Sequence, residues 1–265
     1  MKASLALLLL MGSAAQAADW GADVSASASS ALQAFQAKQA APAKAAAALK
    51  EADCGSEWVS VVSQDEETAA LACEGFRRAL GFMLARGYQP KSKLTIIAAD
   101  RFPDRYREMV GDLIDNMHGF YDTDTREVYM KSLRWFMESE AERTPLGVGP
   151  SRELYVSYFA HEAGHHLSVQ AFAKAPQLIA RPHGEFISYA LQLETMAEGL
   201  KNNLFKRFEA AGGGAFSSVE SINGFAHDAD PQSFAVKSYL FLKGPEGEKT
   251  LQGFMDAKIE PPAAF

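Results

Sequence analysis

Residues 161–165 read His-Glu-Ala-Gly-His, and this segment restricts the possible folds more than any other feature of the chain. Residues at positions i and i+4 lie on one face of a helix, one turn apart. On a helix, the imidazoles of His161 and His165 can therefore bind one tetrahedral zinc ion. Glu162 projects beside the metal position, where it can act as general base toward a water molecule. The segment predicts a helix that carries a zinc site.

Two other interpretations of this segment are a chance match and a pair of surface histidines. The chain has six histidines, so a chance HExxH is expected on the order of once per hundred such sequences. Tyr155, Phe159 and Leu167 flank the motif, which predicts a largely buried helix. Two buried imidazoles on one face need partners, and a metal ion satisfies both. His166 points elsewhere and is expected to be an ordinary contact residue.

A zinc ion held by two histidines needs a third protein ligand, and the fourth position is left for water. The metzincin pattern would require glycine at position 168 and histidine at position 171. The chain has Ser168 and Ala171 instead. Alanine offers no ligand atom, so the metzincin class is excluded and the third ligand must come from another element.

Three glutamates on the next predicted helix are candidates for the third ligand. At about 100° per residue, Glu194 and Glu198 lie roughly on the opposite face of this helix from Glu185. Only one face of the helix can be turned toward the metal. Glu185 follows His165 after nineteen intervening residues, enough for a reversal between packed helices. A carboxylate in the first turn is also favoured by the helix dipole. We predict Glu185 as the ligand, with a capping role for Glu185 and ligation by His183 as alternatives.

The HEAGH segment followed by this glutamate resembles the gluzincins, the thermolysin-like zinc metallopeptidases. The segment from Glu185 to Tyr189 is also similar to the glutamate helix of aminopeptidase-type gluzincins. The resemblance covers about residues 153–190 and points to an uncharacterised bacterial branch with a minimal domain. It implies an α+β, zincin-like fold with a small mixed sheet, an HExxH active-site helix, a mostly helical C-terminal lobe and a zinc ion on the floor of a cleft.

The resemblance also implies a tyrosine or histidine that stabilises the oxyanion of the tetrahedral intermediate. Tyr189, one turn after Glu185, and His227 are the predicted catalytic candidates, and Tyr239 is a third possibility. The alternative interpretations are core aromatics for the two tyrosines and a surface position for His227. In gluzincins an edge strand pairs with the extended substrate, and residues 119–130 would supply that strand here.

Hydrophobic periodicity and turn residues predict the remaining elements. Ser151 is the expected N-cap of the motif helix, and order is expected to begin near Trp58. The expected helices cover residues 65–86, 103–115, 151–169, 184–209 and 233–242, the expected strand covers 93–99, and a hairpin is expected at 119–130.

The N-terminus has the features of an exported protein. Residues 1–17 combine a lysine, a short apolar run and a small-x-small site, which is typical of a cleaved signal peptide. The apolar run is too short to cross a bilayer, and no stable membrane insertion is expected. Residues 18–52 form a low-complexity extension, and residues 53–265 are predicted to be the metallopeptidase domain.

Cysteine usage and charge agree with this placement. An exported chain with only Cys54 and Cys73 is expected to form one disulfide bond. The net charge of -7 and the absence of basic runs argue against a nucleic-acid partner.

The predicted function is zinc-dependent peptide-bond hydrolysis in the periplasm or outside the cell, with a peptide or protein as substrate. Two alternatives stay open. One is a non-catalytic zincin fold that binds a peptide or cell-envelope partner. The other is an exported helical protein in which HExxH is a chance match.

Overall fold

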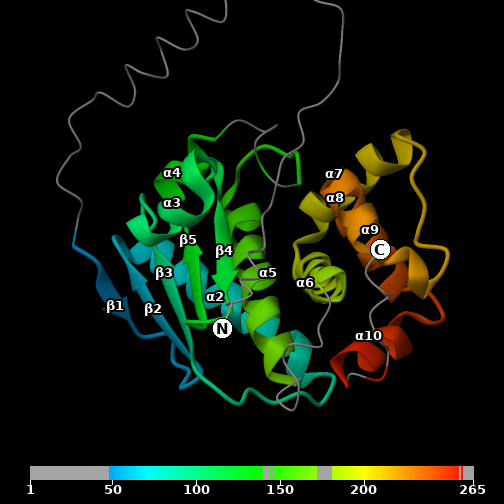
Figure 1. The fold of residues 1–265 in the computed structure, drawn as a ribbon, viewed down its shortest axis with the longest axis horizontal. Helices are drawn as coiled ribbons and strands as arrows, with labels where there is room; N and C mark the ends of the chain where they lie inside the picture. The colour runs from blue at the N-terminus through cyan, green and yellow to red at the C-terminus, as the bar shows by residue number, and fades with distance from the viewer. Residues whose placement is uncertain (1–47, 140–143, 145, 172–180, 257, 259–265) are drawn as a thin grey trace, which may run out of the picture. The chain divides into compact units, whose positions relative to one another are not determined.

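A computed structural model describes residues 48–139, 144, 146–171, 181–256 and 258 (Figure 1). The strands are β1 (Lys50–Ala52), β2 (Val59–Ser63), β3 (Leu94–Ala98), β4 (Gly119–Asp122) and β5 (Glu127–Met130). The helices are α2 (Glu66–Leu84), α3 (Asp104–Val110), α4 (Leu133–Met137), α5 (Arg152–Ala171), α6 (Arg181–Thr195), α7 (Glu198–Ala210), α8 (Gly224–Ala229), α9 (Pro231–Leu242) and α10 (Gly247–Met255). Among the described residues, η1 (Gly111–Asn116) and η4 (Val219–Ser221) are short 3-10 helices. The predicted α+β class is confirmed.

The five strands form one mixed sheet in the order β1-β2-β3-β5-β4. β2, β3 and β5 are parallel, whereas β1 and β4 are antiparallel edge strands. The expected strand at 93–99 and the expected hairpin at 119–130 are both confirmed, as β3 and as β4–β5. We expected order to begin near Trp58, but the described residues already form strand β1 from Lys50.

The two faces of the sheet pack against different helices. Phe120 and Tyr129 pair across β4 and β5 with stacked rings 5.3 Å apart. They belong to a small core with Tyr106 of α3. Tyr121 and Val128, one position along each strand, belong to the main core instead. Because side chains alternate along a strand, this period-two pattern places one face of the hairpin toward α3 and the other toward the helical layer.

The helical layer is built around α5. α2 and α5 pack against each other and against the sheet, and α6 packs against α5. Figure 1 shows the sheet on one side of α5 and the helices α6 to α10 on the other. Ser151 caps α5 as predicted, since its hydroxyl accepts a hydrogen bond from the backbone N–H of Leu154 at 3.1 Å.

Gly75 allows α2 to approach α5 closely. A Cβ atom at this position would lie 2.4 Å from Cβ of Phe159 and 2.7 Å from the carbonyl oxygen of Val156. The first atom is the Cβ of α5 residue Phe159 and the second is a backbone oxygen of α5, so neither can move away by a side-chain rotation. The absence of a side chain at position 75 therefore sets the distance between the two helices.

Gly75→Ala should lower the free energy of unfolding by about 3 kcal/mol, because the methyl group forces two packed helices apart. Gly81→Ala is a matched control on the same helix, where an added Cβ meets no atom within 4 Å. The control should be neutral or stabilising by up to about 1 kcal/mol through helix propensity. Denaturant unfolding measures both, and equal effects at the two positions would contradict this packing.

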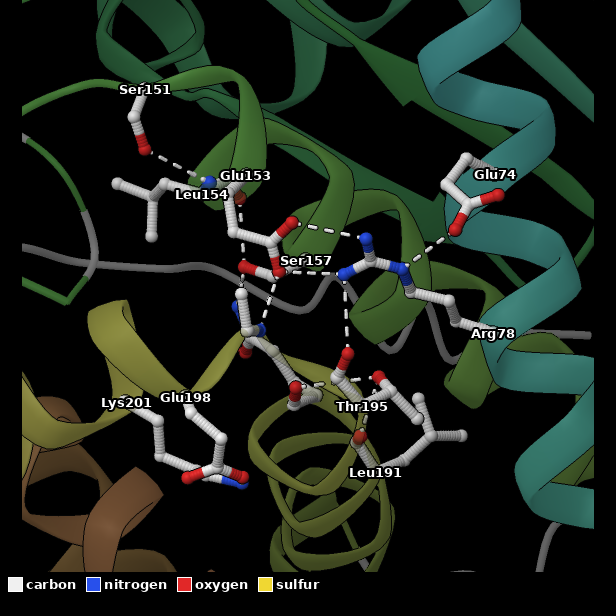
Figure 2. A network of polar contacts seen from close by, with 12 residues as sticks. Glu74, Arg78, Ser151, Glu153, Leu154, Ser157, Leu191, Thr195, Glu198 and Lys201 are labelled. Atoms are coloured by element: carbon white, nitrogen blue, oxygen red, sulfur yellow. Dashed lines mark hydrogen bonds and ion pairs between the residues drawn. The ribbon is translucent and has the colours of Figure 1, made fainter.

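The predicted helix at 184–209 is wrong in one respect, because it is broken between α6 and α7. Figure 2 shows the reason in a polar clamp between α2 and α5. Arg78 donates to both carboxylate oxygens of Glu153, at 2.6 and 3.0 Å, and to the carbonyl oxygen of Thr195 at 3.1 Å. Glu153 also accepts from the backbone N–H of Ala197 at 2.6 Å. The clamp binds backbone groups that a continuous helix would pair internally.

The break also changes the argument about the alternative ligands. Glu198 lies on α7, so helical periodicity no longer relates it to Glu185. It forms an ion pair with Lys201 at 2.6 Å. Glu194, still on α6, forms an ion pair with Lys243 at 2.6 Å.

Two other expectations need correction. The helix expected at 103–115 is split into α3 and η1 at Gly111, whose φ of 63° is incompatible with a continuous helix. Strand β2 was not predicted, although Val59 and Val61 alternate with Ser60 and both valines are buried. The expected helix at 233–242 is confirmed as α9.

Cys54 and Cys73 form the predicted disulfide bond, with Cα atoms 5.3 Å apart. It ties the segment between β1 and β2 to α2. The predicted signal peptide at 1–17 and most of the extension at 18–52 lie outside the described residues. Among the residues that are described, no helix has the length and apolar composition needed to span a membrane.

Removing the disulfide should lower the free energy of unfolding by about 3 kcal/mol, because the bond closes a loop across a sequence separation of 19. For a chain of this size that corresponds to a fall in Tm of about 6–12 °C. Thermal unfolding of the Cys54→Ser, Cys73→Ser double variant checks the expectation. A Tm equal to that of the oxidised wild type would show that the bond adds nothing.

Candidate functional site

His161 and His165 lie on one face of α5, one turn apart, as their spacing predicts. Each histidine is 3% exposed, and their Nε2 atoms are 3.0 Å apart. The two ring nitrogens therefore converge on one point inside the protein. The interpretation of these residues as surface histidines is wrong.

Glu185 reaches the same point from α6. Its Oε2 atom lies 3.5 Å from Nε2 of His161 and 3.7 Å from Nε2 of His165, and the residue is 2% exposed. Gly164 contributes to this approach, because a Cβ atom there would lie 3.1 Å from Oγ of Ser188 and 3.3 Å from its Cα. The glycine inside the motif thus lets α6 pack tightly on α5.

These three side chains form a group that could hold a metal ion, with one ligand atom from each inside a span of 4.8 Å. Two ligands of a tetrahedral zinc ion with bonds of about 2.05 Å lie about 3.3 Å apart. The three distances in the structure, 3.0, 3.5 and 3.7 Å, scatter around that value. Oε2 of Glu185 is buried and has no hydrogen-bond partner among the described residues. The donor set and its spacing fit zinc.

The ionisation of the group also suits a cation. Burial lowers the pKa of His165 to about 3, so its imidazole is neutral at pH 7 and offers a lone pair. Burial by itself would raise the pKa of Glu185, but His165 and His161 outweigh that effect and lower it to about 2. Glu185 is therefore an anion in a place where an unpaired charge would be costly.

Glu162 lies beside this group and is 3% exposed. Burial raises its pKa to about 7, and the nearby carboxylate of Glu185 adds to the effect. His161 and the backbone N–H of Tyr121 act in the opposite direction. Oε2 of Glu162 has no hydrogen-bond partner among the described residues. A carboxylate with this pKa can both accept and return a proton near neutral pH.

In the metal-free protein, Glu162 should make stability fall as the pH rises from 4.5 to about 7. In this interval the unfolded chain releases the proton while the folded chain keeps it, so rising pH favours unfolding. Above that interval, Glu162→Gln should be more stable than wild type by about 3 kcal/mol, and the two should be equal near pH 4. Urea unfolding at both pH values checks this. A gap that stays the same at both would contradict the raised pKa.

His227 is buried at the site, so its interpretation as a surface residue is wrong. It is 2% exposed, and its Nε2 lies 3.8 Å from Oε2 of Glu185. Its Nδ1 lies 2.9 Å from Oδ1 of Asp228. That same oxygen is 3.3 Å from the guanidinium of Arg181. The carboxylate of Asp228 orients the ring, and Nε2 faces the metal-binding group without a hydrogen-bond partner among the described residues.

The other predicted residues are placed as follows. Tyr189 is 1% exposed, and its ring centroid lies 4.4 Å from that of His161. Its hydroxyl is buried and lacks a partner among the described residues. Tyr239 packs against Phe205 of α7, with ring centroids 5.4 Å apart. His183 stacks on a phenylalanine ring of α10 at 3.9 Å.

The profile of a family of unknown function, DUF6639, matches residues 59–261. The chain belongs to the DUF6639 family. The matched region contains all six side chains predicted for the site, from His161 to His227. Comparison with curated proteins and with solved structures gives no match.

Within this DUF6639 chain, two features of the site were not foreseen, namely the burial of the predicted residue His227 and the close helix packing at Gly164. The burial of His227 depends on α8, a helix of six residues that packs against α6 and α9. No local pattern in such a short helix predicts its inner face. Gly164 is different, because a glycine between two ligand positions was a readable signal of close helix packing.

Proposed function

We propose that this chain is a zinc-dependent peptidase that acts outside the cytoplasm. The observation that carries the proposal is the convergence of His161, His165 and Glu185 on one buried point, next to a carboxylate that has a raised pKa. A protein that only needed a structural metal would have no use for Glu162 in this position. The proposed metal ligands are the two histidines and Glu185.

When bound, zinc would lower the pKa of a water molecule and polarise a substrate carbonyl. Glu162 would accept the proton of the attacking water through its unpartnered Oε2 and then deliver it to the leaving amine. Its neighbour His161 offsets only part of the effect of burial, so the pKa of Glu162 stays raised, at about 7.

His227 and Tyr189 are the proposed donors to the oxyanion. His227 Nε2 lies 3.8 Å from Oε2 of Glu185, and the contact between Nδ1 and Asp228 fixes the orientation of the ring. Burial raises the pKa of Tyr189 well above its usual range, so its hydroxyl remains a donor. Of the two, His227 has the better-defined orientation because a carboxylate holds its ring.

The arrangement of the elements supports a zincin-like fold. β4 is one of the two antiparallel edge strands of the sheet and packs beside α5, and α6 follows with the glutamate. An extended peptide could pair with β4 and run past the metal site. Export is supported by the disulfide bond between Cys54 and Cys73, which requires an oxidising compartment to persist. We place the protein in the periplasm or outside the cell.

A peptide library incubated with zinc-loaded protein tests the proposal. We expect cleavage that a chelator stops and that added zinc restores. Cleavage that continues at full rate after complete removal of the metal would overturn it. Tight binding of peptides without any cleavage would favour the non-catalytic zincin fold instead.

A further inference from the structure

The face of α5 that carries the proposed ligands extends further toward the start of the helix. Four residues of this face follow one another at i+4 spacing, namely Glu153, Ser157, His161 and His165. Residues at this spacing lie on one side of a helix, one turn apart. Figure 2 shows the first two of them on α5. This side of α5 faces α6, because both histidines meet Glu185 across the interface.

Ser157 is joined to α6 by a hydrogen bond inside the protein. Nε2 of Gln192 donates to Oγ of Ser157 at 3.0 Å, and both residues are 0% exposed. Ser157 in turn donates to the carbonyl oxygen of Leu154 on its own helix, at 2.7 Å. That bond uses the hydrogen of the hydroxyl and leaves its lone pairs for the amide of Gln192. The direction of the contact between the two helices is therefore defined.

A glutamine at position 192 is an unfavourable choice for the stability of the fold. Its Oε1 atom is buried and has no hydrogen-bond partner among the described residues. A buried polar atom without a partner is destabilising, whereas an apolar side chain of similar size fills the same space without that penalty. A gain in folding stability therefore does not account for Gln192, and its contact with Ser157 needs another explanation.

The contact is placed where it can set the position of Glu185 along α5. Gln192 follows Glu185 by seven residues, about two helical turns, so both lie on one face of α6. Ser157 precedes His161 by one turn. Close packing at Gly164 sets the separation of the two helices, but a hydrogen bond between two defined atoms also sets how far one helix is shifted along the other. A shift by one residue is about 1.5 Å, which is large compared with a zinc–oxygen bond of about 2.0–2.2 Å.

We propose that Gln192 is a positioning residue for Glu185 and acts through its hydrogen bond to Ser157, which fixes the register of α6 on α5. The inference rests on the proposed function, because it takes Glu185 as a metal ligand. Without the bond, α6 can shift along α5 and move the carboxylate away from the two imidazoles. His161 and His165 keep their relative positions, since both belong to α5.

Two substitutions and their combination test this proposal. Gln192→Met keeps the length of the side chain and removes the amide, and Ser157→Ala removes the hydroxyl. Ser157→Ala alone leaves the amide of Gln192 buried without its partner and should destabilise the protein. The double variant removes both polar groups and should return to about wild-type stability. Ser238→Ala is the matched control, since Ser238 is also 0% exposed and donates within its own helix, to the carbonyl oxygen of Phe234 at 2.8 Å.

Competition with a chelator measures zinc affinity, and urea unfolding of the metal-free proteins measures stability. We expect zinc affinity to fall about 10-fold or more in both single variants, within the range known for residues that support a metal ligand. The double variant should lose no more affinity than the weaker single variant, to within about twofold, because each substitution breaks the same bond. Ser238→Ala should keep wild-type affinity. Reduced affinity at wild-type stability in the double variant would support positioning, because a role in packing alone would change both together.

Peptide cleavage by the wild-type protein separates this proposal from the proposed function. If the wild type binds zinc but cleaves no peptide, reduced zinc affinity in the double variant would still support the positioning role and refute the peptidase activity alone. Wild-type affinity in the double variant of an active peptidase would refute the positioning role alone. An equal loss of affinity in Ser238→Ala would also overturn it. Folded wild-type protein that binds no zinc would overturn both proposals, since they share Glu185 as a ligand.

Discussion

Glu162→Gln should lower kcat/KM for peptide hydrolysis by about 10²- to 10⁴-fold, the range expected for loss of a general base. Glutamine has the shape of the carboxylate but cannot accept a proton at Oε2. The residue is buried, and none of the three proposed ligand atoms belongs to it. Zinc content should therefore remain at the wild-type value, and only the chemical step should suffer.

Steady-state kinetics with one cleaved peptide, together with metal analysis of the same sample, checks this expectation. Glu194→Gln is the matched control, because Glu194 forms an ion pair with Lys243 away from the ligand group. It should keep wild-type kinetics. A Glu162→Gln protein that binds zinc and retains full activity would rule out Glu162 as the base.

Glu185→Gln should weaken zinc binding by more than about 10²-fold. Loss of a residue that only supports a ligand already costs about 10- to 100-fold, and Glu185 is proposed as a ligand itself. The two imidazoles would remain, but the site would lack the anion that balances the cation. Activity should be lost at any zinc concentration that leaves the protein folded.

Competition with a chelator of known affinity measures this change. His183→Ala tests the alternative ligand that the sequence leaves open, and Glu198→Gln tests the glutamate that helical periodicity no longer excludes; both variants should keep wild-type affinity. His227→Ala should also keep its zinc, because His227 lies outside the group of three ligand atoms. A loss of zinc in Glu198→Gln with none in Glu185→Gln would contradict the assignment.

Local geometry explains why much of the site could be predicted from the sequence. The placement of His161 beside His165 needs only the helical repeat, and the choice of Glu185 over Glu194 needs the same repeat on the next helix. These arguments use neighbours within one element. They succeed because the pitch of a helix hardly depends on its surroundings.

Tertiary contacts explain what could not be predicted. The break between α6 and α7 depends on Arg78 and Glu153, which lie far from it in the sequence. The inward position of His227 depends on the packing of α8 against α6 and α9. None of these contacts leaves a periodic pattern in the sequence.

The central claim is that His161, His165 and Glu185 bind one zinc ion. Its most direct test is the zinc content of folded, purified protein after reconstitution and removal of excess metal. The account predicts one zinc ion per chain in the wild type and a strong reduction in the His161→Ala and Glu185→Gln variants. Folded wild-type protein that retains no stoichiometric zinc would contradict it.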